Sequence, residues 1–444
     1  MNQSFPRPEP LPLNRLFVED GLLLNAERWQ CAHTYHRQRQ NLHYQSLNQP
    51  GIVCGLGVSV IPAPDDIAAE YRDGRWIKIQ SGIAIDLVGN LIIVPEAMEF
   101  RIASEAKEQP ILVHIVISYV DPEKLHRKEP KCQIQETFRI DEKISYPDDL
   151  EVELCRIILM SGTVLLSQPN HVFFPSENQV DLRYRQQAIA RPQGIVRMAI
   201  AAQNSPADSV ISAYLSGLLQ SVAALYPAMR GIEEVGQVNL EVGVQRDLLL
   251  DHDLLYITYQ QFITLTEAEL EILKEYDRTG GVVLVELDPT TTDFKELIYV
   301  HKKLQRTLLN FEDDNEMAGI RQQLEREWVE TQKSIDKEIE KINSQVQQLA
   351  RQISSYPKES GVIFRQHPLR NQPFLFGEFP LVETQEVKIF NWGGIVFAIG
   401  NISAAWGLCK NLSLPRETIR NAQEMGINIL HFAWRRRQLM QMQL

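Results

Sequence analysis

The residues of this chain whose types suit ligand chemistry follow three apolar runs in its second half. Tyr259, Gln260 and Gln261 follow LLYIT, Glu286 and Asp288 end VVLVELD, and Asn401 and Ser403 follow GIVFAIG. Carboxylate, amide and phenol groups together can hold a hydroxyl-rich ligand or a hard cation. Such ligands usually bind at the carboxyl ends of the strands of an open α/β sheet. A solvated sheet rim without a ligand gives the same pattern, so both interpretations stay open.

Catalytic and metal-binding patterns are weak throughout the chain. No GxSxG turn is present, and the glycines of GIVCGLG precede a strand, so we interpret Cys54 as a small buried hydrophobe. His33, His36 and His43 share one helix face near Cys31. HExxH and CxxC patterns are absent, however, and the interleaved aromatic residues favour a packing face over a metal site. We therefore expect no enzyme activity, no metal and no cofactor.

Length and composition exclude several classes of protein. A chain of 444 residues predicts two or three domains, and 44% hydrophobic with 23% charged residues is ordinary globular composition. No apolar run reaches the roughly 20 residues of a membrane span, so we expect no direct membrane insertion. A net charge of -12 argues against nucleic-acid binding, and the one basic cluster, 435–437, is more typical of a favourable helix end than of an anion site. Five scattered cysteines and a start without an apolar signal core favour the reducing cytoplasm.

The elements of the first half are one helix followed by β-rich runs. Asn25, with Arg28 three residues later, predicts the start of a helix that runs to about Tyr44. Gly89-Asn90 between two apolar runs predicts a hairpin. We therefore expect a β-rich docking domain with a leading helix over 1–170 and a linker over 171–193.

The second half alternates strands with helices from residue 194 onward. Thr266 with Glu269 is a capping box, and Gly280-Gly281 is a helix-ending signal. Alternation of this kind predicts an α/β domain with a flavodoxin-like parallel sheet, divided into 194–292 and 356–444. The fold class expected for the whole chain is therefore α+β multidomain.

An inserted helical hairpin or coiled coil is expected over 293–355. A first helix and a polar turn, EDDNEMAG, precede a long helix with Trp328 near the middle of the insertion. Spacings of four and three residues give that helix a heptad seam. An antiparallel hairpin within the chain is favoured over pairing with a neighbouring copy, because six seam positions are few for a free-standing coiled coil. The seam consists of Ile335, Ile339, Ile342, Val346, Leu349 and Ile353.

Two resemblances to known families follow from the motifs. Over residues 14–186, NRLFVEDGLLLNAERWQCAHTYHRQRQ, PGIVCGLGVSV, SGIAIDLVGNLIIVP and NQVDLRYR resemble the N-terminal region of proteins encoded with phage-tail-like contractile injection systems. The second half resembles an uncharacterised bacterial family with a glutamine-amidotransferase-like, flavodoxin-type fold. Its matching pieces are LLYITYQQFITLTEAELEILKEYDRTGGVVLVE, FRQHPLRNQPF, and GIVFAIGNISAAWG with MGINILHFA. No position matches the catalytic cysteine of true amidotransferases.

These resemblances imply a non-enzymatic structural or adaptor protein that is present in several copies near the baseplate of a particle. Its partners would be baseplate, sheath or tube proteins, and it would meet a membrane only through partners. The alternative is an amidotransferase-like enzyme, or a small-ligand or metal sensor, that uses the strand-end crevice. The residues expected at protein interfaces are Trp29, Tyr35, Arg37, Trp328, Ile335, Ile342 and Leu349.

Overall fold

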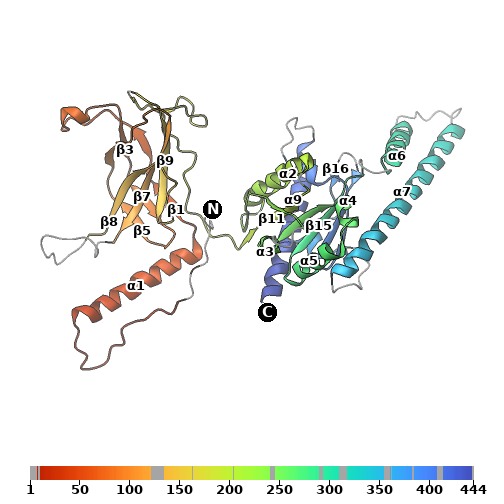
Figure 1. The fold of residues 1–444 in the computed structure, drawn as a ribbon, viewed down its shortest axis with the longest axis horizontal. Coiled ribbons are helices and arrows are strands. Elements are labelled where there is room, and N and C mark those ends of the chain that lie inside the picture. Colours follow the sequence, from red (N-terminus) through yellow and green to blue (C-terminus); the bar gives the residue numbers. More distant parts are fainter. Residues whose placement is uncertain are drawn as a thin grey trace. The chain divides into compact units, whose positions relative to one another are not determined.

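The chain folds as two compact units, residues 1–191 and 192–444 (Figure 1). Cys132, Cys409 and most of the predicted polar turn (312–317) lie outside the described residues. The computed structural model describes residues 8, 11–121, 135–162, 164–203, 205–240, 246–289, 294–309, 318–354, 361, 363–382, 385–407 and 414–442.

Within its described residues, unit 1 contains one α-helix, one short 3-10 helix and three small antiparallel sheets, with strand orders β1-β4-β5, β2-β3-β6 and β8-β7-β9. The buried apolar side chains of these strands pack together in a single hydrophobic core. The hairpin predicted at Gly89-Asn90 is confirmed, since it joins β4 to β5. Its elements are α1 (Ala26–Leu47), β1 (Gly51–Gly55), β2 (Val58–Val60), η1 (Ala69–Tyr71), β3 (Trp76–Ile79), β4 (Gly82–Ile85), β5 (Leu91–Val94), β6 (Met98–Arg101), β7 (Ile111–Val120), β8 (Thr137–Lys143) and β9 (Glu151–Leu159).

Residues 171–191, for which the sequence suggested a linker, belong to unit 1. Asp181 pairs with Arg156 of β9, and Gln187 pairs with Ile52 of β1. The Arg156 guanidinium lies 3.8 Å from the centre of the Tyr184 ring. This segment is therefore built into the β domain.

Unit 2 contains a six-stranded sheet, a parallel pair (β10-β12) and a short antiparallel pair (β16-β17). The capping box of Thr266 and Glu269 is confirmed, and so is the left-handed Gly280, whose φ is +92°. Its elements are β10 (Gly194–Val196), β11 (Met198–Ala201), α2 (Pro206–Leu225), β12 (Met229–Gly231), β13 (Gly236–Val238), α3 (Arg246–Leu250), β14 (Leu254–Thr258), α4 (Tyr259–Ile263), α5 (Glu267–Arg278), β15 (Val282–Leu287), α6 (Phe294–Leu309), α7 (Ala318–Ile353), α8 (Pro368–Asn371), β16 (Leu381–Val382), β17 (Gln385–Glu386), β18 (Lys388–Trp392), β19 (Ile395–Ile399), η5 (Ser403–Ala405) and α9 (Arg416–Gln441).

The predicted flavodoxin-like parallel sheet is wrong, because the large sheet is mixed. Its strand order is β13-β11-β14-β15-β19-β18, and β18 runs antiparallel to β19 at the edge. The turn between them consists of Gly393 and Gly394, since Trp392 pairs with Ile395. Two glycines between apolar runs are a hairpin signal that the sequence interpretation overlooked. With the small antiparallel sheets of unit 1, the chain is α+β and multidomain.

Helices cover both faces of the mixed sheet. One core lies between the sheet and the helices α2 and α9, and a second lies between the opposite face and the helices α4, α5 and α7. By length and apolar composition α2 is the one described helix that could cross a membrane, but the core helix of a folded domain passes the same test. Leu215, Leu218 and Val222 of α2 are buried in the first core.

The heptad seam of α7 packs on the sheet of its own unit. Ile335 and Ile339 are buried in the second core, and Ile342 and Leu349 pack against it half-buried. An amphipathic helix that covers a sheet repeats its apolar residues at the same three and four spacing as a coiled coil. The seam therefore does not offer Ile335, Ile342 and Leu349 to a partner, in contrast to the interface role that we expected.

Helix α6 packs along the first half of α7 within the chain, where the two project from the sheet (Figure 1). Trp328 stacks on His301 of α6, with ring centres 5.1 Å apart. Burial lowers the pKa of His301. Trp328 thus joins the two helices of one chain, which differs from its expected role at an interface between proteins.

The basic run at the end of α9 forms internal clamps. Arg436 lies 2.9 Å from the carboxylate of Asp277 and also donates to the carbonyls of Asp277 and Gly281. Arg437 lies 3.6 Å from Asp253 and donates to the carbonyls of Leu250 and His252. These clamps tie the terminal helix to the rest of unit 2.

Candidate functional site

Glu286, one of the two carboxylates that the sequence singles out, is buried in unit 2. It lies at the carboxyl end of β15 and is 4% exposed. The Tyr256 hydroxyl donates to one carboxylate oxygen at 2.5 Å, and the backbone N–H of Ser403 donates to the other at 2.9 Å. Burial raises the pKa of Glu286, and burial beside this carboxylate raises the pKa of Tyr256 well above its usual range. The group therefore ties β14, β15 and η5 together below the surface.

Replacing Glu286 with glutamine is expected to flatten the pH dependence of the stability of unit 2. A carboxyl whose folded-state pKa is raised contributes fully to stability below its unfolded pKa, and this contribution is lost as pH rises through the folded-state pKa. The free energy of unfolding of the wild-type chain, relative to Glu286→Gln, should therefore decrease as pH rises above about 4.5, the usual pKa of a glutamate side chain. Denaturant unfolding at several pH values measures this difference. A difference that grows with pH would contradict the assignment.

The other predicted ligand residues do not converge on Glu286. Asp288 is half-buried, and the Asn401 amide lies 3.5 Å from its carboxylate. Tyr259 packs on the opposite face, where its hydroxyl donates to Gln345 of α7 at 2.7 Å and its ring stacks on Phe397. Gln260 is exposed. The crevice predicted around these residues is therefore divided between the two faces of the sheet.

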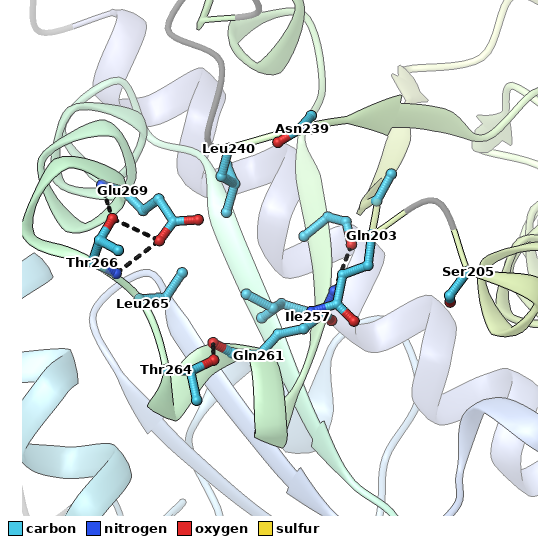
Figure 2. A pocket seen from close by; sticks show the side chains of 12 residues that line it. Gln203, Ser205, Asn239, Leu240, Ile257, Gln261, Thr264, Leu265, Thr266 and Glu269 are labelled. Carbon is cyan, nitrogen blue, oxygen red and sulfur yellow. Dashed lines mark hydrogen bonds between the residues drawn. The ribbon is translucent and has the colours of Figure 1, made fainter.

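A pocket of about 510 Å³ lies one strand away, at the carboxyl ends of β11, β13 and β14 (Figure 2). Sequence reasoning selected Gln261 at a strand end but missed the other residues of this pocket. The signal that could have found it is the set of polar residues that follow the three strands, Gln203, Asn239 and Gln261. Its lining is Ala201, Ala202, Gln203, Ser205, Asn239, Leu240, Ile257, Gln261, Thr264, Leu265, Thr266 and Glu269.

Helix α1 of unit 1 is unusual because none of its 22 residues is buried. Asn25 caps its start by accepting from the Arg28 N–H at 2.9 Å, as the sequence predicts. Trp29 is 57% exposed, and Tyr35 is half-buried with its hydroxyl 3.3 Å from Arg39. A helix that is polar on all sides gains little from packing, although packing of an apolar face supplies most of the stability of helices in proteins.

The second half of α1 is held on the β domain by polar contacts. Arg37 lies 3.4 Å from Asp121, so this expected interface residue has a partner within its own unit. The Gln45 amide donates to the Val88 carbonyl, and the side-chain amides of Asn41 and Asn90 lie 2.7 Å apart. These contacts come from residues 37–45. Residues 26–36, the first half of the helix, are half-buried or exposed at every position.

The turn that receives α1 requires a glycine. Gly89 has a φ of +87°, and a Cβ at this position would lie 2.3 Å from the Asn41 carbonyl oxygen. The Asp86 carboxylate accepts from both the backbone and the side chain of Asn90 at 2.8 Å, which holds the turn in shape. The motif IDLVGN thus builds a seat for α1.

The segment before α1 exposes large apolar side chains without forming a helix or strand. Phe17, Val18 and Leu23 are 75%, 68% and 77% exposed. A groove of about 880 Å³ lies between Pro8 and residues 11–14, one face of α1 and the loop that contains Val88. Exposed apolar residues that are contiguous along the chain are typical of a protein interaction surface. We call residues 11–36 the docking segment.

The described histidines and cysteines of unit 1 do not gather around a metal position. His33 packs edge-on against Trp29, and His36 against Tyr35. Within the described part of the chain, no group of three His, Cys, Asp or Glu residues could hold a metal ion. Cys54 is exposed beside a bulge in β1, so its interpretation as a buried residue is wrong.

Comparisons with known proteins do not assign this chain to a family. No protein-family model matches it, and neither does any curated protein sequence. A solved structure titled "Crystal structure of TssK" has 9% sequence identity and a TM-score of 0.25, over 80% of this chain and 65% of that chain. This chain therefore spans 65% of the length of the TssK chain, and a TM-score this low does not establish a shared fold. None of these findings supports the amidotransferase-like assignment of the second half.

Proposed function

We propose that this chain is a non-enzymatic structural or adaptor component of a contractile injection system, associated with the baseplate. It docks on other proteins of the particle through the docking segment. The observation that carries the proposal is α1, a 22-residue helix without a buried residue that follows an exposed apolar segment. A surface of this kind is expected to be covered in an assembly.

The docking segment is close to neutral, because Arg15 and Arg28 stand against Glu19, Asp20 and Glu27. Its affinity for a partner is therefore expected to come from apolar contacts more than from charge. Trp29 and Phe17 supply the aromatic anchors that dominate the binding energy of typical interfaces.

Affinity purification of the tagged chain from its native host tests the proposal. Sheath, tube and baseplate proteins are expected to co-purify at a fixed stoichiometry, as identified by mass spectrometry and negative-stain microscopy. The double variant Phe17→Ser with Trp29→Ser should weaken their binding by about 1,000-fold and so abolish their recovery, because two anchor residues that contribute about 2 kcal/mol each lose about 4 kcal/mol together.

Phe364→Ser with Leu375→Ser is the matched control, since these side chains are 70% and 81% exposed in unit 2. The control should retain all partners. Full recovery with the Phe17 and Trp29 variant would show that another surface docks.

A further inference from the structure

We infer that the pocket at the carboxyl ends of β11, β13 and β14 binds a small, uncharged, polyhydroxylated molecule of the sugar or polyol class. The inference does not depend on the proposed function in assembly. The pocket has about 510 Å³, which lies within the size range of small-molecule sites.

The position of the pocket in the sheet is the first argument. After β11 the chain passes through α2 to β13 on one side, whereas β14 lies on the other side of β11 and leads on to β15. The connection that follows β11 and the connection that follows β14 therefore run toward opposite edges of the sheet. Ligands of open α/β sheets bind in the crevice that such a divergence opens at the strand ends.

The charge of the lining excludes anionic ligands. None of the 12 described residues that line the pocket is Lys, Arg or His. Two helices that begin at its rim are already capped by their own carboxylates. Asp208 accepts from the Ser205 N–H at 3.2 Å, and Glu269 accepts from the Thr266 N–H at 2.7 Å. These carboxylates repel phosphates and nucleotides from the helix ends.

The hydrogen bonds of the lining decide which uncharged ligand fits. The hydroxyls of Ser205, Thr264 and Thr266 each donate their single proton within the protein. Each hydroxyl oxygen can still accept a hydrogen bond. The Gln261 amide donates to the Ala201 carbonyl at 2.8 Å. The pocket therefore offers mainly acceptors, which suits a ligand that is rich in hydroxyl donors.

The pocket also has an apolar wall and one side-chain amide that can adapt to a ligand. Leu240, Ile257 and Leu265 form its apolar wall (Figure 2). Among the described residues, the Gln203 side-chain amide makes no hydrogen bond, so it can both donate to and accept from a bound hydroxyl. A sugar ring presents an apolar face and a polar edge, which matches this division of the lining.

Saturation-transfer NMR with the full chain tests the inference, using glucose, trehalose and myo-inositol as probes and ATP, inorganic phosphate and spermidine as comparisons. Thermal shifts are avoided because sugars stabilise most proteins through exclusion from their surface. At least one of the three hydroxyl-rich probes is expected to bind with a Kd of about 1 mM or tighter. Binding of a comparison compound alone, or of none of the six, would overturn the inference.

Variants locate the binding. Thr264→Trp places a large ring in the pocket at an exposed position and should weaken sugar binding by about tenfold or more. Gln203→Ala leaves the pocket open, removes its adaptable amide and should weaken binding about threefold. Gln260→Trp, an exposed position on α4 outside the lining, should bind as the wild type does. Unchanged binding in both lining variants would overturn the assignment to this pocket.

Discussion

Arg436→Ala is expected to lower the free energy of unfolding of unit 2 by about 3–5 kcal/mol, and its Tm by roughly 10 °C. Arg436 and Asp277 are almost fully buried, with 11% and 5% of their side chains exposed. Asp277 also accepts from the Gly394 N–H at 3.1 Å, so it holds the turn between β18 and β19. Removing the arginine leaves a buried carboxylate without its cation, which is costlier than the loss of the pair.

Arg435→Ala is the matched control for this prediction. Arg435 precedes Arg436 on α9 and is exposed where it donates to the Gln372 side chain. Its removal should change the free energy of unfolding by less than about 1 kcal/mol. The double variant Arg436→Met with Asp277→Asn should recover part of the stability, because it also removes the uncompensated charge. Equal thermal unfolding of the two single variants would refute the role of the clamp.

Gly89→Ala is expected to release α1 from its seat and to abolish recovery of partner proteins. The added Cβ would lie 2.3 Å from the Asn41 carbonyl oxygen, at a backbone φ of +87°. The core of unit 1 contains no residue of α1, so the β domain itself should remain folded. The loss in its free energy of unfolding should be about 1–2 kcal/mol, the cost of a side chain in a left-handed conformation.

Gly162→Ala controls for backbone strain in this experiment. Gly162 has a φ of +97° in the same unit, and a Cβ there would meet nothing within 4 Å. Gly162→Ala should therefore lose about as much stability as Gly89→Ala but still recover the partner proteins. Circular dichroism and co-purification from the native host measure the two effects. Retained partners in Gly89→Ala would argue against docking through α1.

Local signals in the sequence predicted local structure well. Asn25 caps α1, Gly89-Asn90 forms a hairpin, and Thr266 with Glu269 caps α5. In each case the residues that carry the signal also make the hydrogen bond or adopt the backbone conformation. Interactions between residues up to four positions apart can be predicted directly from the sequence.

Contacts between residues that are distant in sequence could not be predicted in this way. Heptad spacing in α7 does not distinguish a helix partner from a sheet, so the burial of Ile335 on the sheet was not predictable. Arg436 and Asp277 are 159 residues apart in sequence, and only the fold brings them together. Tyr259 follows β14 and Glu286 lies near the end of β15, yet their side chains point to opposite faces of the sheet, because successive positions along a strand alternate between faces. A strand-end position in sequence therefore does not specify a shared crevice.

Hydrogen exchange of residues 26–36, in the purified chain and in the assembly recovered from the native host, tests the docking claim most directly. In the free chain these amides should exchange fast, because the helix has no buried residue to hold it. In the assembly they should be protected, whereas the exposed turn around Gly162 should exchange equally in both. Equal exchange of residues 26–36 in the two samples would contradict the account, since no partner would then cover the helix.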